Sequence, residues 1–163
     1  MAKSLPTKTK RMLFGLGAAV GLNNYTLDVK NISAYDFKHF TGMGDGSTSI
    51  LDQIIREMKK RKQNYSIEDI IMQLNFKVNN STSSEATAAL WARNYLKNLA
   101  STGFFGTSEP KIGELVKVNQ ISVIAMSGIK EKIQQFVVTN LLQKIFDARR
   151  RDVIPPIVLV VEE

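Results

Sequence analysis

Two adjacent carboxylates, Glu162 and Glu163, directly follow the uninterrupted apolar run at residues 157–161 (IVLVV). Such a β-branched run predicts a buried strand, and in parallel α/β sheets ligands bind at the carboxyl ends of the strands. One carboxylate there can hold Mg²⁺ through its water shell while its neighbour polarises an attacking water for phosphoryl transfer. The alternative is a solvated acidic end after an edge strand, and the motif by itself leaves both open.

A second group of residues with a possible binding role is the basic cluster Lys59, Lys60, Arg61 and Lys62. Cations that neutralise phosphates bind nucleic acid independently of base sequence, with an affinity that falls as salt rises. The overall charge agrees with such a partner, since 22 lysines and arginines stand against 15 acidic residues and the formal net charge is +7. The alternative is a solvated surface, because cations also favour the C-terminal end of a helix dipole.

The composition excludes several classes of site. The chain has no cysteine, which excludes thiolate metal sites and cysteine nucleophiles, and its one histidine, His39, excludes sites built from several histidines. The glycines at 15, 17 and 21 match a dinucleotide fingerprint only loosely, because no strand clearly precedes them. No G-x-x-x-x-G-K-[ST] motif occurs, so the backbone cradle and lysine of a P-loop are absent from this sequence.

The basic cluster must be positioned by an amphipathic helix that precedes it. Apolar residues recur there at helical spacing, while charged residues take the other face. This apolar face comprises Ile50, Leu51, Ile54, Ile55 and Met58. The hydroxyl cluster Ser47, Thr48 and Ser49 could cap the start of the helix.

Two further helices are predicted downstream. One begins at Ser66, with Asp69 three residues on as the partner in a capping box. The other begins at Thr82 and is rich in alanine and leucine up to Gly103. Its predicted capping partner is Glu85. This helix carries Trp91 and Tyr95 on one side, where we expect them to pack in the core or against another helix.

The last third of the chain changes from helices to a strand–helix–strand pattern. The β-rich run at residues 120–126 (QISVIAM) ends in the tight turn Ser127-Gly128, and an apolar helical stripe then covers residues 129–148. The run at 157–161 completes the pattern. This order predicts a βαβ crossover into a parallel sheet that is covered on both faces and that carries Glu162 and Glu163 at a strand end.

From about residue 121 to the end, the chain resembles the HerA family of archaeal and bacterial DNA-translocating ATPases, which are related to FtsK. In that family a strand ends in a Ser-Gly turn, a long helix follows, and a basic segment leads into the Walker B strand with its paired glutamates. The matching residues are Ser127, Gly128, Gln134, Gln135, Phe136, Ile145, Phe146, Arg149, Glu162 and Glu163. The helical region at about 32–106 is similar in architecture to the insertion that such proteins carry between P-loop and Walker B strand.

The resemblance implies roles for the carboxylates and a set of partners. Glu162 would order the hydration shell of Mg²⁺, and Glu163 would act as the general base toward water. The family relation also implies ATP, double-stranded DNA, self-association as a hexameric ring and a partner nuclease for the parent protein. The chain departs from the family at Ala125, where an acidic residue is usual, and in lacking the P-loop. We therefore expect ATP hydrolysis only from a longer chain, and no cofactor bound to this chain alone.

The expected fold class is α/β and mostly helical, with a helical bundle followed by a parallel βαβ fragment of a RecA-like P-loop ATPase core. The expected organisation is an unassigned segment at 1–31, a helical insertion at 32–106 and the core fragment at 107–163. We interpret the chain as a fragment of a HerA-like DNA translocase or helicase; the alternative is a small basic nucleic-acid-binding or assembly module without catalysis. No apolar run reaches the roughly 20 residues that span a bilayer, so no membrane contact is expected. The lack of cysteine fits a reducing compartment, so a cytoplasmic location is expected.

Overall fold

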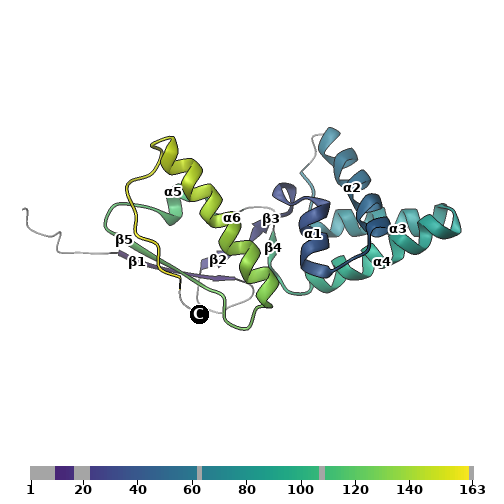
Figure 1. Ribbon diagram of the computed structural model, residues 1–163, viewed down its shortest axis with the longest axis horizontal. Helices are drawn as coiled ribbons and strands as arrows, with labels where there is room; N and C mark the ends of the chain where they lie inside the picture. Colours follow the sequence, from purple (N-terminus) through teal and green to yellow (C-terminus); the bar gives the residue numbers. More distant parts are fainter. Residues whose placement is uncertain (1–9, 17–22, 62–63, 107–108, 162–163) are drawn as a thin grey trace, which may run out of the picture. The chain divides into compact units, whose positions relative to one another are not determined.

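The computed structural model describes residues 10–16, 23–61, 64–106 and 109–161, and the chain forms two compact units. Unit 2 comprises Tyr25–Glu109, whereas unit 1 combines Met1–Asn24 with Pro110–Glu163. Figure 1 shows the strands β1 and β5 of unit 1 and the helices α1 to α4 of unit 2. Unit 1 is therefore assembled from both ends of the sequence, and unit 2 is an insertion within it.

Unit 2 is mostly helical because its apolar residues recur at helical spacing. Its elements in chain order are β3 (Leu27–Asp28), the 3-10 turn Val29–Asn31, α1 (Ala34–Thr41), α2 (Asp45–Lys60), α3 (Ile67–Asn80), α4 (Ser83–Ala100) and β4 (Phe105–Gly106). Helices α3 and α4 pack against each other along their length, and α2 packs on α4. The centre of this core holds fully buried side chains, among them Phe37, Leu51, Ile70, Leu74 and Leu96. The three helices predicted from the sequence are α2, α3 and α4.

The predicted capping box at the start of α3 is confirmed. The backbone N–H of Asp69 donates to the Ser66 hydroxyl oxygen at 3.3 Å, and the backbone N–H of Ser66 donates to the Asp69 carboxylate at 2.8 Å. The same reciprocal pair, Ser33 with Asp36, starts α1. Each box satisfies backbone donors that the first turn of a helix leaves without an intrahelical partner.

We expect the substitution Ser66→Ala to lower the free energy of unfolding of unit 2 by about 1 kcal/mol, because it removes the cap of α3. Urea unfolding followed by circular dichroism measures this change. Thr82→Ala is the matched control: Thr82 is the N-cap residue of α4, but its side chain makes no cap hydrogen bond. Equal losses in the two variants would contradict the importance of the Ser66 side chain.

The start of α2 differs from the prediction. The helix begins at Asp45 with Gly44 as its N-cap residue, so Ser47 and Thr48 lie inside the first turn and do not cap it. Both side chains are buried, and the Ser47 hydroxyl donates to the Ala88 carbonyl oxygen of α4 at 2.9 Å. The Thr48 hydroxyl donates to the Gly44 carbonyl oxygen at the start of the same helix, at 2.9 Å. The hydroxyls that suggested a cap therefore bond to backbone carbonyls, one across the α2–α4 contact and one within α2.

The predicted capping box of α4 is also absent, although Thr82 is its N-cap residue. Glu85 instead pairs with Lys77 of α3, with 3.0 Å between the carboxylate Oε1 and the ammonium Nζ. This hydrogen bond and the lysine's charge lower the pKa of Glu85. The carboxylate that could have capped α4 therefore bridges the two helices of the α3–α4 pair.

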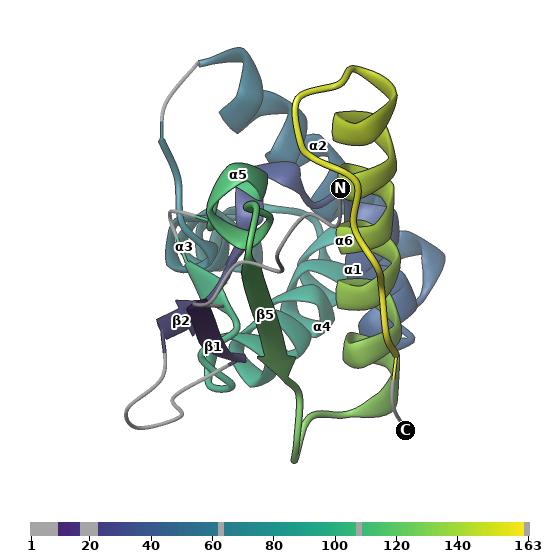
Figure 2. The same cartoon turned by 90° about the vertical axis from the view of Figure 1, so that its left-hand side faces the viewer.

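Unit 1 contains a three-stranded sheet in the order β2-β1-β5, which Figure 2 shows from one side. Its elements are β1 (Lys10–Leu16), β2 (Asn23–Tyr25), α5 (Ile112–Leu115), β5 (Gln120–Ala125) and α6 (Glu131–Arg150). The last residue of β2, Tyr25, is also the first residue of unit 2. Strands β1 and β5 are parallel, with Leu13 opposite Val123. Phe14 of β1 and Ile133 and Val137 of α6 are buried, so the apolar side chains of this unit do form a core.

The predicted strand–turn–helix from residue 120 is confirmed as β5, a turn and α6. Gly128 in the turn has a φ of 78°, in the left-handed region that glycine adopts without strain. The predicted second strand of the crossover is wrong for this structure: residues 157–161 form no strand, and Val158 is 89% exposed. A β-branched run favours an extended chain, but a strand also needs a hydrogen-bonded neighbour, and the sheet as described ends at β5, which pairs with β1.

Within the described parts of the chain, none of the helices combines the length and apolar character that a bilayer crossing requires.

Candidate functional site

The basic cluster predicted from the sequence lies at the C-terminal end of α2. Lys59 and Lys60 are the last residues of the helix, Arg61 follows as its C-cap residue, and all three are exposed. Lys62 lies outside the described residues. Where the structure describes the chain, none of these three cations forms an ion pair, whereas Arg56 on the same helix pairs with Asp52 at 2.7 Å. The cluster is thus a solvent-facing group of positive charges, on a helix whose opposite face is anchored in the core.

The paired carboxylates Glu162 and Glu163 lie outside the described residues, so their predicted magnesium site stays a prediction. The chain that leads to them is described up to Val161; it has no regular secondary structure there and is largely exposed. Ile157, at its start, packs against the apolar cluster of Ile145, Ala148 and Ile154. Elsewhere in the described ranges, no group of three or more histidine, aspartate or glutamate side chains is placed to hold a metal ion.

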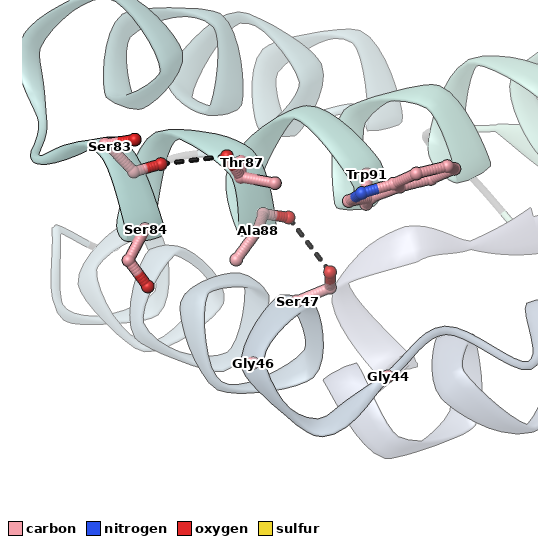
Figure 3. A pocket seen from close by; sticks show the side chains of 8 residues that line it. All are labelled: Gly44, Gly46, Ser47, Ser83, Ser84, Thr87, Ala88 and Trp91. Atoms are coloured by element: carbon pink, nitrogen blue, oxygen red, sulfur yellow. Dashed lines mark hydrogen bonds between the residues drawn. The ribbon is translucent and has the colours of Figure 1, made fainter.

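An open cavity of about 550 Å³ lies between the first turns of α2 and α4 (Figure 3). Its lining consists of small or hydroxyl-bearing residues and one indole: Gly44, Gly46, Ser47, Ser83, Ser84, Thr87, Ala88 and Trp91. The hydroxyls of Ser47 and Thr87 donate to backbone carbonyls, at 2.9 and 2.8 Å. No carboxylate, amine or imidazole lines the cavity, so its residues offer hydrogen bonds and contact area but no general acid or base.

Trp91 of α4 lies on the outside of unit 2, contrary to the prediction, whereas Tyr95 on the same helix is partly buried. Trp91 is 56% exposed, and its ring lies 6.5 Å from that of Tyr95, centroid to centroid. The buried face of α4 consists of Ala89, Ala92, Leu96 and Leu99. Small alanines on this face allow close helix packing, which leaves no room for an indole in the core. In the sequence, the spacing of the alanines and leucines indicates the buried face of α4 more reliably than the aromatic pair does.

A short ion pair also lies beside the N-terminal end of α2. The Lys38 ammonium donates to the carboxylate of the exposed Asp45 at 2.5 Å and holds the pKa of that carboxyl below its usual value. The pairing connects α1 with the first residue of α2. Because both groups are solvent-exposed, the pair contributes little to stability and gives no sign of a perturbed catalytic group.

Comparison with known proteins gives one family. Neither a curated protein nor a solved structure matches the chain. A family model described as the central domain of the helicase HerA matches residues 4–145, which include most of unit 1 and all of unit 2. The resemblance seen from about residue 121 onward therefore extends over most of the chain, although Glu162 and Glu163 lie beyond the matched residues. The chain belongs to the HerA helicase central-domain family.

Proposed function

We propose that the chain is part of an ATP-driven double-stranded-DNA translocase or helicase of the HerA type. The observation that carries the proposal is the family match over residues 4–145, which spans both compact units. A sheet with parallel strands followed by a long helix is consistent with a piece of a RecA-like ATPase core. Self-association as a ring and a partner nuclease are part of the same proposal and rest on the family alone.

Unit 1 has the surface expected of an incomplete α/β core. Leu13, Ile121 and Val123 are about half exposed, and their positions in the β1–β5 register place them on one face of the sheet. Parallel sheets are normally covered on both faces. A face of this kind supports the proposal that further elements of a larger protein cover it.

The proposed enzyme requires residues 157–161, which form no strand in this structure, to join the sheet as a further parallel strand when the rest of the protein is present. The segment is rich in the β-branched residues that favour a buried strand, and it pairs with no other strand in the structure. Addition of the strand would place Glu162 and Glu163 at its carboxyl end, where ligands bind in parallel sheets. Glu162 is then the residue that holds hydrated Mg²⁺, and Glu163 accepts the proton of the attacking water.

The carboxylates fit the oxygen ligands that Mg²⁺ prefers, whereas the sequence has no P-loop to hold the β- and γ-phosphates of ATP. ATP binding is therefore assigned to the longer parent protein. When bound, the magnesium ion neutralises charge that develops on the transferred phosphoryl group. The role proposed for this chain's own residues is to position the ion and to move a proton.

The basic cluster at the end of α2 is the proposed contact with the DNA backbone. Replacing Lys59, Lys60 and Arg61 together by glutamine should weaken duplex binding for all sequences. If each cation contacts one phosphate, the slope of log K against log salt should fall in magnitude by about 0.9 per contact, or about 3 in total. Fluorescence anisotropy with a duplex across a salt series measures this slope.

The matched control is the triple replacement of Lys97, Lys111 and Lys117 by glutamine, which removes the same charge from other exposed positions. An equal change of slope in both triple variants would show that general charge, and not the α2 cluster, carries the binding.

The proposed function is tested with the longer protein purified from its source. We expect magnesium-dependent ATP hydrolysis that double-stranded DNA stimulates, together with movement of the protein along duplex DNA. We expect no hydrolysis from the 163-residue chain. A longer protein that binds neither ATP nor duplex DNA would overturn the proposal, as would hydrolysis by this chain alone.

A further inference from the structure

The chain enters unit 2 at Tyr25 and leaves it at Glu109, and these two ends are joined by several contacts. Strands β3 and β4 pair in parallel, with Leu27 opposite Phe105 (Figure 1). The backbone N–H of Leu27 also donates to the Phe104 carbonyl oxygen at 2.8 Å. The entry and exit segments are therefore held side by side by backbone hydrogen bonds.

A side-chain hydrogen bond joins the two end residues themselves. The Tyr25 hydroxyl donates to Oε1 of Glu109 at 3.1 Å, across a separation of 84 residues. Tyr25 is fully buried, and burial together with the Glu109 carboxylate raises the pKa of its hydroxyl far above its ordinary value. The phenol therefore stays protonated and remains a donor throughout the physiological pH range.

The close approach of the two segments depends on glycine at position 106. A Cβ added there would lie 2.6 Å from Oγ1 and 2.9 Å from Cβ of Thr26. Real Cβ atoms essentially never come so close to other heavy atoms, and the Thr26 Cβ is fixed to the backbone, so a larger residue would push the segments apart. Gly106 is therefore needed for space beside Thr26.

We propose that these contacts form a clasp that closes residues 25–109 into a self-contained folding unit, which opens and closes independently of unit 1. We define the clasp as Tyr25, Thr26, Leu27, Phe105, Gly106 and Glu109. When the two ends of an insertion bind each other, contacts within the unit itself restrict the conformational freedom of both ends. The helices of unit 2 then need no support from the rest of the chain, and opening the clasp releases them together. The inference concerns folding and does not depend on ATP or DNA.

Hydrogen exchange measured by mass spectrometry on the full chain tests this inference, because exchange reports local opening segment by segment. We expect Gly106→Ala to speed exchange in α1 to α4 by about 10-fold or more, while exchange in β1, β5 and α6 stays unchanged. Tyr25→Phe removes one hydrogen bond and should act in the same direction with a smaller effect, about 2- to 10-fold.

Two further variants separate the clasp from general damage. Gly44→Ser is the control, because an added Cβ at Gly44 meets nothing within 4 Å; it should leave exchange in unit 2 no faster than in the wild-type chain. The double variant Thr26→Gly with Gly106→Ala removes the Thr26 side-chain atoms that the added methyl group would meet, and we expect it to restore most of the protection. Both results support the clasp.

Three results would overturn the inference. Gly106→Ala could leave exchange in unit 2 unchanged, which would show that the close approach has no energetic role. It could accelerate exchange equally in both units, which would show that the chain opens as a single body. The double variant could remain as unprotected as Gly106→Ala, which would show that the contact with Thr26 is not what the substitution disturbs.

Discussion

Phe37→Ala should lower the free energy of unfolding of unit 2 by about 3–5 kcal/mol, because it removes a large buried ring from the centre of the helical core. Phe37 of α1 is 0% exposed. Its ring lies 6.3 Å from that of Phe40 and 5.8 Å from that of Phe105, centroid to centroid. The substitution therefore leaves a cavity at the point where α1 meets β4, and both neighbouring rings lose a packing partner.

Urea unfolding followed by circular dichroism measures the loss, and hydrogen exchange assigns it to a unit. The matched control is Phe76→Ala on α3, since Phe76 is 64% exposed and its truncation should change stability by no more than about 0.5 kcal/mol. Loss of protection should be confined to unit 2. Similar stability losses in both variants would show that burial of Phe37 does not dominate the packing of this core.

The helices of unit 2 could be predicted because their information is local. Apolar residues spaced three and four apart identify the buried face of α2, and Ser66 with Asp69 identifies the start of α3 from four consecutive positions. Local caps fail where tertiary packing competes for the same groups. The Ser47 hydroxyl bonds to a carbonyl of α4, and Glu85 bonds to Lys77 of the neighbouring helix.

The sheet could not be predicted correctly because its pairing is not local. Strand β5 lies more than 100 residues after β1, and nothing in the sequence of either strand specifies the other. The run at 157–161 is the more strand-like segment by composition, yet it has no ladder in the structure. Composition indicates which segments favour an extended backbone, whereas the choice of neighbour depends on the assembled fold.

Of the two parts of the candidate site, the basic cluster could be predicted from the sequence more fully than the paired carboxylates. The placement of Lys59, Lys60 and Arg61 at a helix end followed directly from the periodicity of α2, and the structure confirms that position and their exposure. The position of the two carboxylates depends on whether residues 157–161 join a sheet, and such pairing involves residues far apart in the sequence. Their role therefore needs a chemical test in the longer enzyme that we propose.

Glu163→Gln in the longer protein should abolish ATP turnover while leaving ATP binding intact. Glutamine has nearly the same size as glutamate, but its amide is neutral and cannot accept a proton from the attacking water. Loss of a positioned general base typically costs about 10²- to 10⁴-fold in rate. In the proposed site, binding should persist, because Glu162 would retain its charge toward hydrated Mg²⁺ and the phosphates would be held outside this chain.

The two carboxylates can be distinguished by their response to magnesium. Glu162→Gln should raise the magnesium concentration needed for half-maximal turnover, because it removes a ligand charge, whereas added magnesium should not rescue Glu163→Gln. Glu68→Gln, at an exposed position in the first turn of α3, is the control for loss of one negative charge and should retain full turnover. Single-turnover hydrolysis and nucleotide binding, measured together, separate the chemical step from affinity. Substantial turnover by the Glu163→Gln protein would remove the assignment of Glu163 as the base, and rescue by magnesium would reassign it as an ion ligand.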